Sequence, residues 1–164
     1  MTAAITLAGP GDIAVLAEML TRLATDLEAG EKFRGTPEAL ARYGTGPDAL
    51  FRALIARNGG RAEGFALFFP HFSTWRAQPG VYVQDLWVAP ETRGSGLGER
   101  LLAATARHAA EGWGARYLML SVDAQNGGAR RFYERLGFRP QKDDRPMALE
   151  GDAFARLRGT EAAA

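Results

Sequence analysis

The stretch from Val81 to Leu102, VYVQDLWVAPETRGSGLGERLL, decides the fold. Its first eight residues are rich in β-branched and aromatic side chains, which predicts a strand. Ala89-Pro90 ends that strand, because proline has no backbone N–H to give to a sheet ladder. Glycines then occupy positions 94, 96 and 98, and leucine and alanine follow at helical spacing. We therefore predict a strand, a glycine-rich turn and a helix in direct succession.

The glycine-rich turn has the composition of an anion site. A helix N-terminus leaves N–H groups unpaired, and glycine lets a phosphate approach the backbone closely. Arg93 adds a fixed positive charge beside the turn. A dinucleotide fingerprint would need a third glycine where Glu99 stands, and no lysine follows as a P-loop requires. A nucleophile elbow would need glycines around Ser95, where the chain has Arg93 and Leu97. The alternative is a tight turn that binds nothing.

Composition sets further bounds. A chain of 164 residues with 46% hydrophobic content predicts one domain spanning 1–164, with a disordered tail at about 159–164. The formal net charge of +1 predicts no nucleic-acid partner. No apolar run is long enough to span a membrane, so we expect no membrane partner and a cytoplasmic protein. The chain has no cysteine and two histidines, which excludes disulfides and thiol nucleophiles and argues against a metal site.

The rest of the chain predicts the element order β-α-α-β-β-β-α-β-α-β-β. Three consecutive strands, ending with Val81–Val88, would form an antiparallel meander, with a hairpin at Asn58-Gly59 and a loop from His71 to Gly80. The elements expected outside the central stretch are strands at 5–7, 50–56, 64–69, 117–122, 138–140 and 145–149, helices at 13–29, 37–43 and 129–136, and a helical turn at 154–157. This order predicts an α/β fold with a mixed, mostly antiparallel central sheet flanked by helices.

Two motifs carry a resemblance to a known family. The pattern Arg93-x-x-Gly96-x-Gly98, directly after a strand that ends in Val-x-Pro, resembles the pyrophosphate-binding motif of the GNAT superfamily of acyl-CoA N-acyltransferases. Asn126, followed by ARRFYERLGF at 129–138, is similar to the second motif of that family. The predicted order of elements is also similar to the GNAT fold. Within the superfamily, YVQDLWV at 82–88 resembles the central strand of the diamine (spermidine/spermine, thialysine) acetyltransferase branch.

The resemblance implies an N-acetyltransferase that uses acetyl-CoA as co-substrate, needs no metal, acts on a small-molecule amine and forms a possible homodimer. It implies cofactor contacts from two backbone segments and one downstream helix, namely from Leu86, Trp87, Val88, Arg93, Gly94, Ser95, Gly96, Leu97, Gly98, Asn126 and Tyr133. Two other classes stay open at this point. One is a protein acetyltransferase that acts on a lysine or an N-terminus, and the other is a catalytically silent acyl-CoA-binding module.

Two catalytic roles need side chains: removal of a proton from the amine and stabilisation of the departing thiolate. With no cysteine and no nucleophile elbow, direct attack in a ternary complex is favoured over a covalent acyl-enzyme. Asp85 is the nearest carboxylate for the first role, and Tyr133 is the candidate hydrogen-bond donor for the second. The alternatives are that Asp85 pairs with an arginine and that Tyr133 packs at a helix end.

The acceptor site is less well marked. In the related branch a Glu-Asp pair stands where this chain has Gln84-Asp85, and glutamine cannot take up a proton as a base. In a regular strand Gln84 and Asp85 point to opposite faces, so only one of them faces the acceptor unless a β-bulge intervenes. The candidate substrate-binding residues are Glu28, Glu31, His71 and Gln84.

Overall fold

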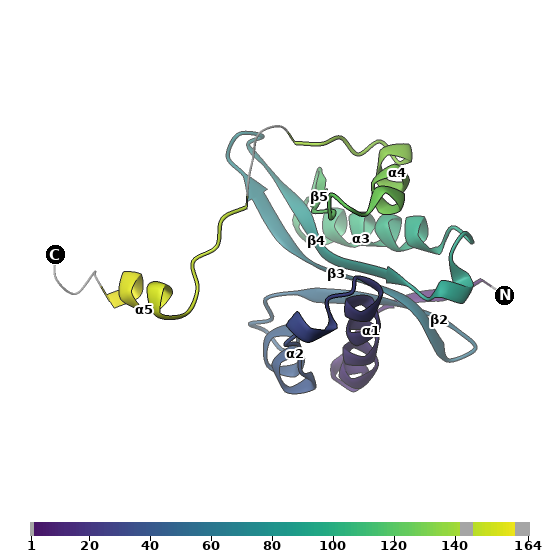
Figure 1. Ribbon diagram of the computed structural model, residues 1–164. Helices are drawn as coiled ribbons and strands as arrows, with labels where there is room; N and C mark the ends of the chain where they lie inside the picture. Colours follow the sequence, from purple (N-terminus) through teal and green to yellow (C-terminus); the bar gives the residue numbers. More distant parts are fainter. Residues whose placement is uncertain (1, 142–145, 160–164) are drawn as a thin grey trace. The chain divides into compact units, whose positions relative to one another are not determined.

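The computed structural model describes residues 2–141 and 146–159 and divides into two compact units, Met1–Asp123 and Ala124–Ala164. The first unit holds a five-stranded sheet in the order β1-β2-β3-β4-β5 (Figure 1). Neighbouring strands are antiparallel except for β4 and β5, which are parallel. The strands are β1 (Ala4–Leu7), β2 (Arg52–Asn58), β3 (Arg61–Ser73), β4 (Gln78–Val88) and β5 (Leu118–Leu120). The predicted mixed, mostly antiparallel α/β sheet is confirmed.

Helices cover both faces of this sheet. They are α1 (Ile13–Asp26), α2 (Pro37–Gly44) and α3 (Leu97–Trp113), and short 3₁₀ turns occupy Pro10–Asp12, Gly30–Lys32 and Pro90–Thr92. In Figure 1, α1 and α2 lie on one face and α3 lies on the other. α2 begins where the sequence predicts, because the Thr36 hydroxyl caps it by accepting from Ala39 N at 3.2 Å and Pro37 follows at its first position.

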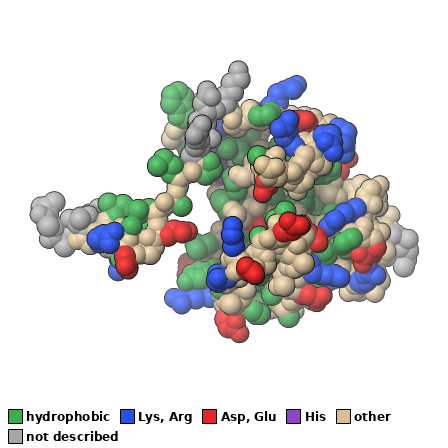
Figure 2. Space-filling view, in the orientation of Figure 1, with side chains coloured by type: hydrophobic (Ala, Val, Ile, Leu, Met, Phe, Trp, Pro, Cys, Tyr) green, Lys and Arg blue, Asp and Glu red, His purple; other side chains and the backbone are tan. Residues whose placement is uncertain are grey.

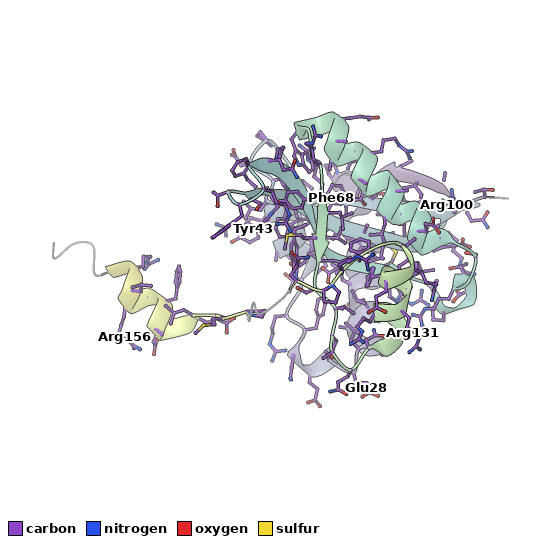
Figure 3. The ribbon with its side chains drawn as sticks, turned by 90° about the horizontal axis from the view of Figure 1, so that it is seen from above. Glu28, Tyr43, Phe68, Arg100, Arg131 and Arg156 are labelled. Carbon is purple, nitrogen blue, oxygen red and sulfur yellow. The ribbon has the colours of Figure 1, made fainter. Side chains whose placement is uncertain are left out.

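Each face of the sheet has its own packed layer. Under α1 and α2 the buried side chains include Leu16, Ile55, Phe65 and Trp87. On the other face Phe68, labelled in Figure 3, stacks against Trp113 of α3 with ring centroids 6.5 Å apart. Full burial of one such large apolar side chain stabilises the fold by about 1.5–3 kcal/mol. These two layers pack against β3 and β4, and β4 carries several of the candidate site residues described below.

Two hairpins connect β2, β3 and β4. The β2–β3 hairpin predicted at Asn58-Gly59 is confirmed, with Gly59 and Gly60 as its central residues at φ values of 55° and 83°. The loop predicted from His71 to Gly80 is wrong in its extent, because β3 continues to Ser73, β4 begins at Gln78 and His71 pairs with Gly80, so that only residues 74–77 form a turn. Gly80 is needed for a close approach and not for a turn, since an added Cβ would lie 2.3 Å from the Tyr117 ring.

The second unit contains α4 (Gly127–Arg135) and α5 (Gly151–Gly159). The helix expected at 129–136 is therefore confirmed, and the turn expected at 154–157 lies within the longer α5. The two final strands are not formed: residues 138–141 and 146–150 adopt no strand, and Arg145 lies outside the described residues. Pro140 supplies no N–H, and Met147 is 96% exposed, so neither segment has the pairing or the buried face that a strand needs. Of the tail expected to be disordered at about 159–164, Gly159 is the last residue of α5, and residues 160–164 lie outside the described residues.

Charged side chains of both signs intermingle on the face shown in Figure 2. Among the described residues, no helix is long and apolar enough to cross a membrane. Within the same residues, no cluster of three or more His, Cys, Asp or Glu side chains is arranged to hold a metal ion.

Candidate active site

A β-bulge lies in the middle of β4. Leu67 of β3 pairs with Asp85, but the next residue of β3 pairs with Val83, so Gln84 is an extra residue in β4. In such a bulge two residues of one strand face a single residue of its partner, here Gln84 and Asp85 opposite Leu67. Both residues therefore lie on the face of the sheet that α1 covers, which is also the face of Trp87. In a regular strand Gln84 and Asp85 would point to opposite faces, and the bulge allows both to lie on the same face.

The pairing between β4 and β5 ends just before this bulge. The two strands pair from Val81 to Val83 of β4, whereas the pairing of β4 with β3 continues to Val88. Ala89 N donates to Glu63 O at 2.8 Å, toward β3, so alternation turns the main-chain groups of Leu86 and Val88 the other way. Within the described part of the first unit, no strand pairs with β4 on that side beyond Val83. This half of β4 therefore presents a main-chain edge that is open at Leu86 and at the Val88 N–H, whereas Val88 O accepts from Arg93 Nε at 3.0 Å.

The glycine turn follows directly. Gly94 and Gly96 have φ values of 79° and 81°, in the left-handed region that glycine adopts without strain. A Cβ added at either position would meet no atom within 4 Å, so the space in front of the turn is open. The Ser95 hydroxyl donates to Thr92 O at 2.6 Å, which stabilises the turn. The predicted turn between strand and helix is confirmed.

The N-terminus of α3 is uncapped. The first helical bond runs from Arg100 N to Gly96 O at 3.1 Å, which leaves the N–H groups of Leu97, Gly98 and Glu99 without a helical acceptor. Gly96 is the N-cap, and no side chain of the described residues accepts from these groups as a cap. Together with the partial positive charge of the helix end, these free N–H groups have the chemistry that an anion needs, at the end of the open strand edge.

The N-terminus of α4, in the second unit, is capped by contrast. Asn126 Oδ1 accepts from Ala129 N at 3.0 Å, so this asparagine has a structural role at the position where the sequence predicts a cofactor contact. Farther along α4, the half-buried Tyr133 ring packs edge-on against Phe138 with centroids 5.5 Å apart. Burial raises the pKa of Tyr133, so its hydroxyl stays protonated at neutral pH and can donate a hydrogen bond.

Arg93 is bonded on two sides. Its Nε donates to Val88 O at 3.0 Å, and its Nη2 donates to Asp26 Oδ2 at 2.5 Å. The same Asp26 oxygen accepts from Trp87 Nε1 at 2.8 Å, which satisfies the polar atom of an indole that is only 3% exposed. The hydrogen bond from Trp87, and then the Arg93 guanidinium, hold the pKa of Asp26 below its usual value. Sequence reasoning missed this contact because 67 positions separate its two charged partners.

Asp85 is half-buried and lies next to the exposed Gln84. Burial raises the pKa of the Asp85 carboxyl, because the ionised form is poorly solvated there. No lysine or arginine among the described residues forms an ion pair with Asp85. The alternative role of an arginine partner is therefore not seen, and Asp85 is a carboxylate with an enhanced affinity for a proton.

The other candidate acceptor residues lie apart from Asp85. His71 pairs with Gly80, four residues farther along β3 than Leu67, which at about 3.3 Å per residue is roughly 13 Å from the bulge. Its Nδ1 atom is 2.5 Å from the Tyr117 hydroxyl, so one of its nitrogens is already engaged. Glu28, labelled in Figure 3, and Glu31 are exposed and follow the end of α1.

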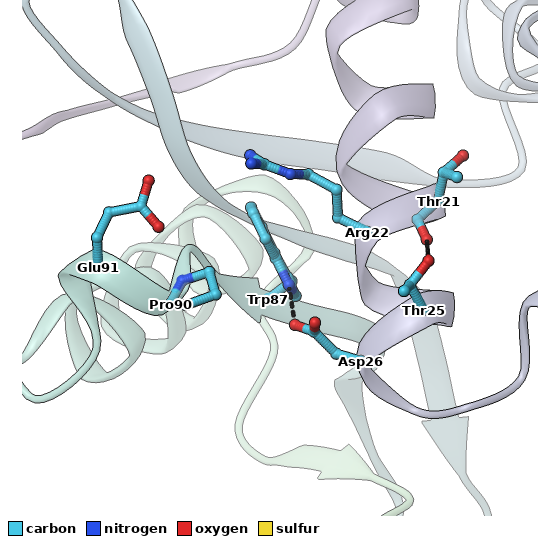
Figure 4. A pocket seen from close by; sticks show the side chains of 7 residues that line it. All are labelled: Thr21, Arg22, Thr25, Asp26, Trp87, Pro90 and Glu91. Carbon is cyan, nitrogen blue, oxygen red and sulfur yellow. Dashed lines mark hydrogen bonds between the residues drawn. The ribbon is translucent and has the colours of Figure 1, made fainter.

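A pocket of about 300 Å³ lies between α1 and the end of β4. Figure 4 shows Trp87 at its centre, with Arg22 over the ring at 5.4 Å and Asp26 bonded to the indole nitrogen. The pocket is lined by Thr21, Arg22, Thr25, Asp26, Trp87, Pro90 and Glu91. The Asp26 side chain, which lines this pocket, is 35% exposed to solvent.

Two relatives and one solved structure illustrate what this chain is similar to. A thialysine N-epsilon-acetyltransferase of Sus scrofa is 28% identical over 160 residues, covering 91% of this chain and 93% of that protein. An L-ornithine N5-acetyltransferase of Arabidopsis thaliana is 34% identical over 111 residues, covering 68% of this chain and 45% of that protein. The crystal structure of an aminoglycoside acetyltransferase from an uncultured soil metagenomic sample has the same fold, with a TM-score of 0.76, 16% identity and coverage of 91% of this chain and 97% of that one.

The family model described as the acetyltransferase (GNAT) family matches residues 17–138. That range includes the bulge in β4, the glycine turn and the helix that carries Tyr133. The match extends over more than half of the sequence, and this chain belongs to the acetyltransferase (GNAT) family.

Proposed function

We propose that this chain transfers the acetyl group of acetyl-CoA to the primary amine of a small molecule. The observation that carries the proposal is the direct succession of the open half of β4 and the uncapped N-terminus of α3. A long ligand with amide groups in its arm and a pyrophosphate at its centre fits this succession. The arm can pair with main-chain groups of a strand edge, and the phosphates can meet backbone N–H groups.

The residues present fit that ligand. We assign the arm to the main chain at Leu86, Trp87 and Val88, with both groups of Leu86 and the N–H of Val88 on the open side of β4, while Val88 O accepts from Arg93. The pyrophosphate is assigned to the turn, whose open space in front of Gly94 and Gly96 supports the assignment, together with Arg93. The remaining assigned positions are Ser95, Leu97, Gly98, Asn126 and Tyr133.

Asp85 is the proposed proton acceptor. Acetyl-CoA supplies a thioester, which a free amine can attack in a ternary complex without a covalent enzyme intermediate. An alkylamine has a reference pKa near 10.4, so roughly one molecule in a thousand is unprotonated at neutral pH. A carboxylate whose pKa is raised by burial is better matched to take up the amine proton than an exposed one. Gln84, on the same face, can orient the amine by hydrogen bonding but cannot take its proton.

Tyr133 is the proposed donor to the leaving thiolate. A thiol has a reference pKa near 8.5 and a tyrosine near 10, and burial raises the pKa of Tyr133 further. Complete proton transfer from the tyrosine is therefore uphill, whereas a hydrogen bond to the developing negative charge is not. We assign Tyr133 this hydrogen-bonding role.

The acceptor is proposed to be a small aliphatic amine. This rests on the names of the relatives, which specify thialysine and L-ornithine, and on the position of Asp85 at the bulge. Glu28, Glu31, His71 and Gln84 are the proposed contacts with the rest of that molecule. We further propose that residues 1–164 form one catalytic domain that works in the cytoplasm as a homodimer. The 96% exposure of Met147 supports a surface that a second copy covers, and light scattering separates dimer from monomer.

Titration calorimetry with acetyl-CoA tests the cofactor assignment. Gly96→Asp places a side chain at a left-handed φ and a carboxylate in front of the helix N-terminus, and we expect acetyl-CoA affinity to fall about 100-fold or more. Gly114→Asp is the matched control, because Gly114 caps the other end of α3 at a φ of 72°. Unchanged affinity in a folded Gly96→Asp protein would exclude the phosphate assignment. A screen of acetyl-CoA consumption over diamines, amino acids, aminoglycosides and peptides then identifies the acceptor.

A further inference from the structure

Asp26, the last residue of α1, connects that helix to the end of β4 and to the glycine turn. Its Oδ2 atom accepts from Trp87 Nε1 at 2.8 Å and from Arg93 Nη2 at 2.5 Å. The Trp87 bond fixes the carboxylate, because a buried indole cannot move without disturbing the core around it. Asp26 is therefore a fixed acceptor at the guanidinium end of the Arg93 side chain.

The Arg93 guanidinium is held at two points. Nε donates to Val88 O at 3.0 Å and Nη2 donates to Asp26. Because the guanidinium is planar and carries five N–H donors in a rigid fork, two such bonds set the direction of the remaining donors. The Arg93 side chain is still 52% exposed, so part of the guanidinium can meet an anionic ligand.

We propose that Asp26 is a positioning residue, which holds Arg93 ready for the pyrophosphate of acetyl-CoA. The inference rests on the proposed function, since it needs acetyl-CoA at the glycine turn. An arginine that is ordered before binding loses less side-chain freedom when the ligand arrives. In the absence of Asp26, that ordering cost falls on the binding step and the affinity drops.

An opposing effect is repulsion between the Asp26 carboxylate and the phosphates. The Asp26 and Arg93 side chains are 35% and 52% exposed, so water and salt screen this repulsion. The carboxylate is also neutralised locally by the guanidinium that it contacts. The ordering effect therefore decides, and its expected size is about a two- to tenfold loss of affinity when one long side chain is no longer held.

The test measures acetyl-CoA affinity by calorimetry in the wild-type protein, Asp26→Asn, Arg93→Ala and the double variant. Asparagine keeps an oxygen that can accept from Trp87 but loses the charge that holds Arg93. We expect a two- to tenfold weaker affinity for Asp26→Asn, and a double variant within about twofold of Arg93→Ala, because Asp26 acts through Arg93. In turnover, KM for acetyl-CoA rises and kcat stays unchanged, as expected for a loss of uniform binding.

Asp12→Asn is the matched control. Asp12 precedes the other end of α1 and pairs with Arg57 at the same N–O distance of 2.5 Å, far from the glycine turn in sequence. Its removal should change unfolding temperature but not acetyl-CoA affinity. An Asp26→Asn protein with unchanged or tighter affinity, or a double variant clearly weaker than Arg93→Ala, would overturn the positioning role alone. A wild-type protein that binds no acetyl-CoA would overturn the proposed function as well.

Discussion

The two halves of β4 differ although they belong to one strand. In the first half, from Gln78 to Val83, β4 is paired with β3. Residues 81–83 are also paired with β5, and Val81 and Val83 are buried. From Asp85 to Val88 it is paired with β3 alone and presents an open main-chain edge. Gln84, the bulged residue, stands between the two halves. The first half stabilises the sheet, and the second half carries the proposed chemistry.

A single extra residue is enough to produce this difference. A bulge bends its strand and increases the local twist, and the pairing of β4 with β5 ends at Val83, directly before the bulged Gln84. The bulge also places Gln84 and Asp85 on one face, so a carboxylate and an amide lie side by side next to the open edge. Both halves of β4 remain paired with β3, so the second half keeps a fixed register with that strand. The proposed function thus depends on an irregularity within an otherwise regular sheet.

The first way to test this contrast is to remove the carboxylate of the open half. Asp85→Asn should lower kcat/KM by about 10²–10⁴, the usual contribution of a positioned general base. The loss should be largest below the pKa of the acceptor amine and should shrink as rising pH supplies more free amine. Steady-state rates between pH 6 and 10 measure both effects. A pH-independent loss would assign Asp85 a structural role.

The same substitution should have the opposite effect on stability. Burial raises the pKa of Asp85 in the folded protein, so between the unfolded and folded pKa values the folded state retains a proton that the unfolded state has lost. The free energy of unfolding therefore decreases as pH rises through that interval. At neutral pH Asp85→Asn should raise the unfolding temperature while it lowers activity. A lower unfolding temperature would mean that the Asp85 carboxylate has stabilising partners.

A second test asks whether a residue outside β4 contributes to the chemistry. Tyr133→Phe keeps the ring that packs against Phe138 and removes only the hydroxyl. We expect kcat to fall by about 10²–10³, the typical cost of one donor to a developing negative charge, with acetyl-CoA affinity almost unchanged. Phe132→Leu is a control on the same helix for general effects of packing. If Tyr133→Phe retains the wild-type kcat, the hydroxyl has no catalytic role.

The sequence predicts those parts of the candidate site whose structure is determined by residues adjacent in the chain. The strand, the glycine turn and the start of α3 follow from local composition, and each is present. The bulge is different, because it is defined by the register between β3 and β4, and nothing in VYVQDLWV marks Gln84 as the extra residue. The ion pair between Asp26 and Arg93 also depends on the tertiary fold, which brings the end of α1 to the end of β4.

Gly80 and Gly96 show that a glycine can be required for two different structural reasons. Gly80 follows Pro79, a pair that is typical of a loop, yet both lie inside β4. The reason is the Tyr117 ring, which occupies the space where a Cβ at position 80 would stand. Gly96, by contrast, has a left-handed φ with open space around it, so its glycine serves the backbone conformation. Sequence alone does not separate these two causes.

The sharpest test of the contrast within β4 is deletion of Gln84, for which we expect a loss of about 10² in kcat/KM. The pairs Leu67–Asp85 and Phe68–Val83 would then be consecutive, as in a regular antiparallel ladder. Val83 would remain on the face of α3 and Asp85 on the face of α1, so the core keeps its contacts and the protein should stay folded. Without the bulge, β4 would lose its local bend, and the reacting groups would be misplaced by an ångström or more.

Gln84→Ala separates the bulge from the side chain, because it removes the amide and keeps the extra residue. The deletion should therefore lose more activity than Gln84→Ala, while circular dichroism and unfolding temperature show that both proteins are folded. Acetyl-CoA affinity should fall in the deletion variant only, since only that variant changes the main-chain edge that Leu86 and Val88 offer. If the deletion variant and Gln84→Ala have similar activity and similar acetyl-CoA affinity, the open half of β4 does not need the bulge. The proposed division of β4 into a half that stabilises the sheet and a half that carries the chemistry would then be wrong.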